Sequence, residues 1–254
     1  MRATLNGIVS SDEDVRFYRY FGYSAFSPQD VRIMLAENPD GEELIFEINS
    51  PGGSVLAGSE IYTVIRSAGN VKTRAEVQSL AASAASYFAL ACGEVWISPV
   101  AQMMIHLPAT WTEGDRTDHL QSVQMLDTIR ESIINAYELK AGGKADRAEF
   151  RRMMSATTWL TAQEAVEKGL ADGILFQEES VPQNVMNALG SGIRALGCSG
   201  GMPDIVQLRA EYARCNPPAP AEAPETTETA GAEPVANNQD WRPQARLDLE
   251  KIRF

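Results

Sequence analysis

Residues 83–92 read SAASYFALAC, and this segment constrains the fold because its side chains are small or apolar on every side and none is charged. A helix of this kind has no polar face to present to water, so it suits a wholly buried position. Gly93 follows directly and can end the helix. With 44% hydrophobic residues, the 254-residue chain can enclose such a helix in one domain and still carry an appended part.

Short apolar strands and helices alternate on both sides of this segment. We expect strands over 2–9, 44–48, 71–78, 94–99, 102–106 and 173–176. Helices are expected from residue 28, after residue 53, and over 83–92, 115–141, 145–154 and 161–169. Thr161 and Glu164 form a capping box at the start of the last one. This alternation predicts an α/β domain with a mainly parallel sheet covered by helices.

The alternation is lost after Phe176. Residues 216–238 contain five prolines, four glutamates and no Lys or Arg, a composition that buries too little apolar surface to offset chain entropy. We therefore divide the chain into a folded domain over 1–180, a poorly defined extension over 181–215, a disordered Pro/Glu/Ala linker over 216–240 and a short amphipathic segment over 241–254.

The charge balance and the cysteines exclude several classes of protein. Lys and Arg total 22 against 34 Asp and Glu, so we expect no nucleic-acid partner. Cys92, Cys198 and Cys215 are an odd number without metal-ligand spacing, which predicts neither a disulfide framework nor a metal site. No stretch approaches the length of a membrane span, and we expect a cytoplasmic protein.

Two residues could carry nucleophilic chemistry. Ser83 begins the buried helix, where backbone N–H groups lack partners, and His106 ends an apolar strand. Taken singly, Ser83 also fits a packing role, His106 a core histidine, and Gly52-Gly53 an ordinary turn.

Four segments together resemble the Clp protease proteolytic subunit over about residues 3–175. They are INSPGGS (48–54), LAASAAS (80–86), MMIH (103–106) and WLTAQEAVEKGLADGIL (159–175), in the family's order and close to its spacing. The resemblance implies a Clp/crotonase-like fold of repeated β-β-α units with a long handle helix. The AASAAS version, the early first strand and the acidic Pro-rich tail look most similar to the head-maturation (prohead) proteases of tailed phages.

The resemblance also implies roles for individual residues. Ser83 matches the nucleophile and His106 the general base. Gly53 and Ala84 match the backbone donors of the oxyanion hole, and Gly52 permits the turn. No cofactor is implied.

The third position of the family's triad departs from its pattern. Two residues before Trp159, where the family has an Asp, this sequence has Thr157. A Thr hydroxyl can orient an imidazole but cannot balance its positive charge. Either the enzyme works as a slow dyad, or another carboxylate substitutes, and Glu149 and Asp146 are the nearest upstream acids.

The resemblance implies a serine endopeptidase that processes capsid or scaffold proteins, in the host cytoplasm if the chain is phage-encoded. We expect the peptide to bind as an added strand beside Gly52-Gly53. In this resemblance the helix over 115–141 corresponds to the family's handle, which implies a homo-oligomeric ring, although its apolar stripe also fits internal packing. A Clp ATPase partner and ATP dependence are not expected, because the chain begins almost at its first strand.

Other readings stay open. A general cytoplasmic Clp-like peptidase is one, and a peptidase with a Ser–Lys pair is another, for which Lys72 is the nearest lysine. A crotonase acting on coenzyme A thioesters and a catalytically weakened assembly protein share the fold. His119 is expected to be a solvated surface residue and Cys92 a packing residue.

Overall fold

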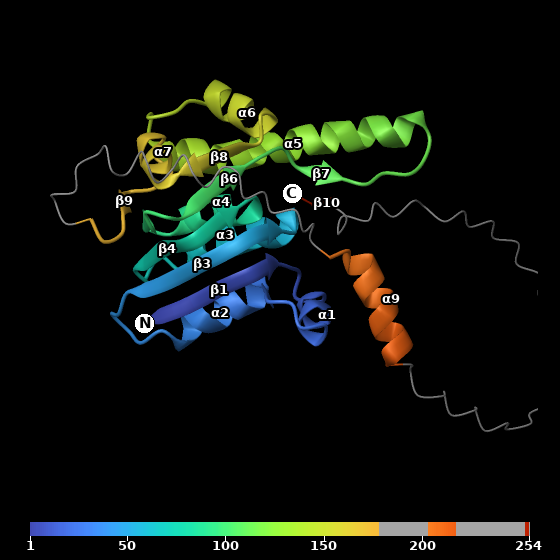
Figure 1. Cartoon of the computed structure of the whole chain (residues 1–254), viewed down its shortest axis with the longest axis horizontal. Coiled ribbons are helices and arrows are strands. Elements are labelled where there is room, and N and C mark those ends of the chain that lie inside the picture. Colours follow the sequence, from blue (N-terminus) through green and yellow to red (C-terminus); the bar gives the residue numbers. More distant parts are fainter. Residues whose placement is uncertain (178–202, 217–251, 254) are drawn as a thin grey trace, which may run out of the picture.

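The computed structural model describes residues 1–177, 203–216 and 252–253. Its main sheet has the strand order β2-β1-β3-β4-β5-β9 (Figure 1). In addition, β6 pairs with β4, and β8 pairs with β6. The strands are β1 (Arg2–Val9), β2 (Ala25–Phe26), β3 (Leu44–Gly53), β4 (Thr73–Ala82), β5 (Glu94–Ile97), β6 (Gln102–Ile105), β8 (Thr158–Thr161) and β9 (Gly173–Ile174). All pairings in this sheet are parallel except that of β6 with β8. The predicted α/β fold with a mainly parallel sheet is confirmed.

The described helices are α1 (Val15–Tyr20), α2 (Pro28–Glu37), α3 (Val55–Ser67), α4 (Ala84–Phe88), α5 (Arg116–Ala141), α6 (Arg147–Ser155), α7 (Ala162–Glu167) and α9 (Ile205–Cys215). Helices α2 and α7 begin at the residues that the sequence predicts as caps. Capping boxes open α2 at Ser27 and α7 at Thr161, and Asp115 caps α5. The long helix α5 runs past the strands of the sheet (Figure 1).

The segment over 83–92 is buried throughout, as its composition predicts. It forms α4 and then one 3-10 turn (Ala89–Ala91). Phe88 of this segment belongs to the same core cluster as Val95 of β5 and Ile134 of α5. The side chains of this helix therefore lie between the sheet and α5.

Strand β4 pairs with different neighbours along its length. Residues 74–77 pair with β5, and residues 80–82 pair with β6. Strands β3, β4 and β6 are neighbours and parallel, so their carboxyl ends meet at one edge of the sheet. Because β8 is antiparallel to β6, the start of β8 lies at the same edge.

Three features differ from the sequence-based expectations. Strand β3 continues to Gly53 instead of ending at Ile48, because the glycine pair still lies in register with β1. Residues 10–23, for which neither a strand nor a helix is expected, contain α1, and the extension over 181–215 contains α9.

Helix α9 packs on α1 (Figure 1). Together with β1 and β2 they enclose a second, smaller apolar cluster, formed by Ile8, Val15, Phe17, Tyr18, Ala25, Ile205 and Leu208. Arg209 Nε also donates to Asp14 Oδ1 at 2.6 Å. These apolar residues are too few and too far apart in the sequence to show a helical period that points to this contact.

The linker over 216–240 lies outside the described residues except for Asn216. Of the segment over 241–254, the structure describes the backbone of β10 (Ile252–Arg253). This strand pairs antiparallel with β7 (Ala109–Thr110), which follows His106 by three residues.

Candidate active site

Three of the residues singled out by the sequence meet at the carboxyl edge of the sheet. Gly52 lies at the end of β3, Ser83 directly follows β4, and His106 directly follows β6. Ligands of open α/β sheets bind outside this edge, because the loops and helix starts converge there. The fold therefore brings together segments that are far apart in the sequence.

Ser83 has an unusual backbone conformation. Its φ is 59° and its ψ is −123°, a region that costs a non-glycine residue about 1–3 kcal/mol. Two backbone hydrogen bonds hold it: Ser83 N donates to Met104 O at 2.8 Å, and Ser86 N donates to Ser83 O at 3.0 Å. The side chain is almost fully buried, and Ser83 Oγ has no hydrogen-bond partner among the described residues. The strained turn thus presents an unengaged hydroxyl at the sheet edge.

Gly52 lies against this turn and has to be glycine. Its φ is +94°, and a Cβ there would lie 2.6 Å from Ser83 Cβ and 2.9 Å from Ala84 N. Gly53 has a φ of +153° and would meet Val9 O at 2.1 Å if it carried a Cβ. The glycine pair therefore allows β3 to approach both the Ser83 turn and β1 closely.

His106 is half-buried, and its Nε2 atom is buried. Burial lowers the pKa of His106, because removing the charged imidazolium from water costs more free energy than removing the neutral ring. This direction is opposite to the one that an adjacent carboxylate would give. The imidazole is therefore neutral near pH 7, as a general base requires.

Thr157 lies at the same edge but is exposed. It precedes Thr158, which is in register with Ile105 at the end of the β6–β8 ladder. Its φ is 51°, which is unfavourable for a β-branched residue, and its N–H donates to Met154 O at 3.1 Å. Thr157 and His106 therefore lie at the same end of the β6–β8 ladder.

The two acids considered as substitutes have structural partners. Asp146 caps α6 and accepts from Glu149 N at 2.7 Å. Glu149 Oε1 accepts from Lys168 Nζ at 2.5 Å. Each carboxylate therefore already stabilises α6 or its contact with α7.

The structure separates three further residues from this edge. Lys72 precedes β4 and pairs with Glu43, about 35 Å along the strand from Ser83 at the usual rise per residue. A Ser–Lys pair of these two residues is thereby excluded. His119 is exposed, and burial raises the pKa of Cys92 to about 12, so both predictions for these residues are confirmed.

Sequence reasoning missed two hydroxyl groups beneath the Ser83 turn. Ser86 Oγ donates to Ser83 O at 2.6 Å and lies 2.6 Å from Tyr137 Oη. Both side chains are fully buried. Ser86 belongs to the AASAAS motif and Tyr137 to the apolar stripe of α5. The sequence therefore indicates this contact only through the presence of a hydroxyl-bearing residue in each of two otherwise apolar patterns.

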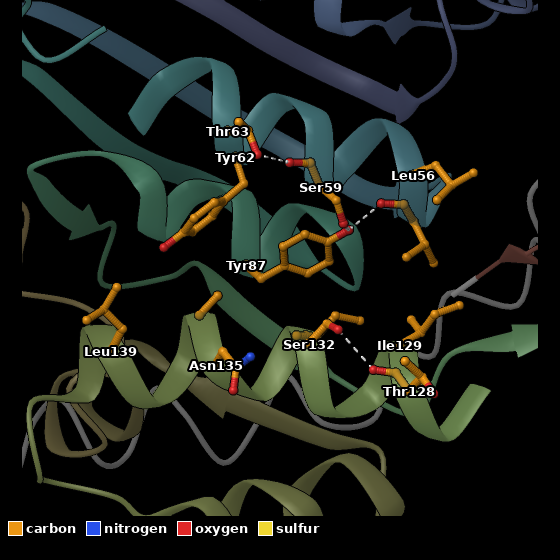
Figure 2. A pocket seen from close by; sticks show the side chains of 13 residues that line it. Leu56, Ser59, Tyr62, Thr63, Tyr87, Thr128, Ile129, Ser132, Asn135 and Leu139 are labelled. Atoms are coloured by element: carbon orange, nitrogen blue, oxygen red, sulfur yellow. Dashed lines mark hydrogen bonds between the residues drawn. The ribbon is translucent and has the colours of Figure 1, made fainter. Parts of the chain in front are cut away.

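A groove of about 480 Å³ runs between α3 and α5 (Figure 2), and neither Ser83 nor His106 lines it. Tyr87 lies in its floor and donates its hydroxyl to Val55 O at 2.8 Å. Leu56 and Leu139 on its two sides are exposed. The groove therefore presents apolar surface on both helices.

The described part of the chain contains no group of three His, Cys, Asp or Glu side chains that could hold a metal ion. Among the described helices, none is long and apolar enough to cross a bilayer.

Comparison with known proteins points to one family. Its profile, described as Clp protease, matches residues 30–178. The ATP-dependent Clp protease proteolytic subunit 1 of Chlamydia abortus is 38% identical over 144 residues, which are 55% of this chain and 72% of that protein. The subunit 1 of Protochlamydia amoebophila is 36% identical, over 56% of this chain and 69% of that protein. The proteolytic subunit of Pleurastrum terricola is 32% identical, over 56% and 72%.

Proposed function

This chain belongs to the Clp protease family, and we propose that it is a serine endopeptidase with Ser83 as nucleophile and His106 as general base. The observation that carries this assignment is the convergence of two parallel strand ends. Ser83 N donates to Met104 O, two residues before His106, so the two candidate side chains follow neighbouring strands at one edge. The buried, unengaged Ser83 hydroxyl is what a nucleophile at this position requires.

The reaction follows from the positions of these groups. His106 takes the proton of Ser83 Oγ while this oxygen attacks the carbonyl carbon of the peptide bond. The N–H groups of Gly53 and Ala84 stabilise the negative charge on the carbonyl oxygen. His106 then returns the proton to the leaving amine. Water attacks the acyl-enzyme by the same route and releases the second product.

For the third position we propose an incomplete triad. Thr157 can hold the imidazole through its hydroxyl, and it supplies no charge. The lowered pKa of His106 is consistent with such a site. We therefore expect a slower peptidase than a triad with Asp would give.

We propose that the substrates are capsid or scaffold proteins processed during phage head maturation, in the cytoplasm of the host cell. Support comes from the AASAAS version of the nucleophile motif and from the acidic Pro-rich stretch over 216–238. Extended segments of such proteins need no unfolding, so we propose activity without ATP. The relatives are named as ATP-dependent, and cleavage that requires an added Clp ATPase would favour a general Clp-like peptidase instead.

A peptide substrate would bind in extended form. Strand β7 follows His106 closely and lies outside the main sheet, where it already pairs with the backbone of β10. Helix α3, which follows Gly52-Gly53, also contacts β10. This arrangement supports binding by strand addition between the glycine pair and β7.

We propose a homo-oligomeric ring built through α5. The helix is long, and its groove with α3 carries exposed apolar residues on both sides. Sedimentation of the purified chain at micromolar concentration should show a species larger than a dimer. A monomer under these conditions would contradict the ring.

We propose that residues 1–180 form the catalytic domain and that the segments beyond it do not carry catalytic groups. Ser83, His106 and Thr157 all lie within this range. The packing of α9 on α1 makes the extension a structural support of this domain.

The test of the proposed function is Ser83→Ala in the full chain. The substitution removes one hydroxyl at a small-residue position, so the fold should persist and peptide cleavage should be lost. A fluorophosphonate probe should label the wild type and not the variant. The replacement of the triad carboxylate by Thr157 favours one alternative, a weakened assembly protein, and an unlabelled wild-type Ser83 in folded protein would support it.

A further inference from the structure

Two buried hydroxyl groups form a hydrogen-bonded chain that ends on the backbone carbonyl of Ser83. Ser86 is on α4, and Tyr137 comes from α5, 51 residues further along the chain. Ser86 Oγ lies 2.6 Å both from Ser83 O and from Tyr137 Oη. Ser86 and Tyr137 are both fully buried, so water does not compete for these contacts.

The direction of each hydrogen bond follows from the groups present. A carbonyl oxygen can only accept, so the Ser86 hydroxyl hydrogen points to Ser83 O. A serine hydroxyl has one hydrogen, and the Tyr137 hydroxyl must therefore donate to Ser86 Oγ. Burial raises the pKa of Tyr137, which keeps its hydroxyl protonated at neutral pH.

The peptide unit between Ser83 and Ala84 connects this chain to the active site. A trans peptide is planar, and its C=O and N–H groups point in opposite directions. Two donors, Ser86 N and Ser86 Oγ, hold Ser83 O on the inner side. The same contacts therefore fix the direction of the Ala84 N–H, which borders the space that Gly52 leaves open.

We infer that Tyr137 is a positioning residue of the oxyanion hole, acting through Ser86 to aim the Ala84 N–H at the site of the developing negative charge. This inference rests on the proposed function, because it assumes that Ser83 attacks a carbonyl. It also links α5, the long helix, directly to the catalytic turn.

The expected effect is on turnover rather than on substrate binding. A donor aimed at the oxyanion stabilises the transition state more than the bound substrate. Removal of a whole oxyanion-hole donor costs about 100- to 1000-fold in kcat. Loss of its support should cost less, about tenfold, because the donor itself stays in place.

The experiment compares four full-chain variants. Tyr137→Phe removes the distal hydroxyl, Ser86→Ala removes the bridging hydroxyl, and a third variant combines both. Tyr87→Phe is the matched control, since it removes a buried tyrosine hydroxyl that donates to Val55 O and not to the Ser83 turn. For each variant kcat, KM, the rate of fluorophosphonate labelling and the Tm are measured.

We expect Tyr137→Phe to lower kcat and the labelling rate about tenfold with KM unchanged, and Ser86→Ala to lower them at least as much. The double variant should be no worse than Ser86→Ala, because both changes interrupt one chain of contacts. Tyr87→Phe should lower the Tm similarly and leave kcat within twofold.

Equal kcat values for Tyr137→Phe and Tyr87→Phe in an active enzyme would overturn this inference and leave the proposed function intact. A wild type that cleaves no peptide and is not labelled would overturn both. If Tyr137→Phe does not fold, an unchanged kcat in Ser86→Ala overturns the inference, and a reduced kcat with unchanged KM supports it.

Discussion

His106 and Thr157 are the next pair of residues beyond the β6–β8 ladder, in which Ile105 lies opposite Thr158. The antiparallel register thus brings the proposed base and the residue proposed for the third triad position to the same end of the ladder. Thr157 is neutral, exposed and held at a φ of 51°. A carboxylate at position 157 would therefore add a negative charge at the same end of the ladder as the base. A residue that tolerates a positive φ would also relieve the backbone strain.

We predict that Thr157→Asp raises kcat. A carboxylate beside His106 stabilises the imidazolium of the transition state, and loss of such a group costs about 10⁴-fold in the well-studied Ser-His-Asp enzymes. A gain of at least about tenfold is expected if no other acid now serves. Peptide hydrolysis under saturating substrate gives the comparison.

Thr157→Asn is the matched control for this change. Asn and Asp both accept left-handed backbone better than Thr, so both should relieve the same strain. Only Asp adds charge. If Asn raises kcat as much as Asp, the gain comes from the backbone and the incomplete triad is contradicted. A loss of turnover in Glu149→Ala or Asp146→Ala would point to a substituted carboxylate.

We predict that activity persists below the pH at which ordinary histidine-dependent activity declines. Burial lowers the pKa of His106, so its neutral form is retained below the usual value of about 6.5. The acidic limb of kcat/KM should fall through an apparent pKa below 6.5 in the wild type. Thr157→Asp should move this limb to higher pH, because a carboxylate favours the imidazolium. A limb above pH 7 in the wild type would contradict the assignment of His106.

We predict that α9 contributes to stability. Leu208 is buried in the α1–α9 cluster, and Leu208→Ala should lower the free energy of unfolding by about 2 kcal/mol. Val206→Ala on the same helix is the control, because Val206 is 48% exposed and its truncation should cost little. Equal effects in a urea titration would show that the cluster does not form.

The contact between α9 and α1 determines where the chain can be truncated without loss of stability. A truncation after residue 216 keeps α9, whereas a truncation after residue 180 uncovers the cluster and removes Arg209 from the buried Asp14. We expect the shorter form to be the less stable one by thermal unfolding. If its Tm equals that of the longer form, α9 is dispensable.

We predict that the C-terminal strand competes with peptide substrates. Ile252→Pro removes a backbone donor and disfavours pairing of β10 with β7. KM should fall while kcat stays constant, and residues 107–112 should exchange amide hydrogen faster. Ile252→Ala keeps the N–H and serves as the control. A KM unchanged in both variants would show that β10 does not occupy the substrate position.

Local patterns predict the α/β class, the buried helix and the long α5 helix. Each pattern is formed by contiguous residues: an apolar segment without a polar face, capping residues, and apolar residues that recur every three or four positions. Ser83 and His106 could be singled out only because four separate motifs together resemble one family. Taken alone, each residue is better explained by a packing role.

The tertiary structure decided what no contiguous pattern encodes. The register of β6 with β8 places Thr157 and His106 at the same end of the ladder, and the packing of α5 brings Tyr137 to Ser86. Helix α9 contacts α1, and the hydrogen bond from Arg209 to Asp14 joins two residues that are almost 200 positions apart in the sequence. These contacts depend on which elements become neighbours after collapse, and a side chain's local sequence carries no information about a partner that reaches it from another layer of the fold.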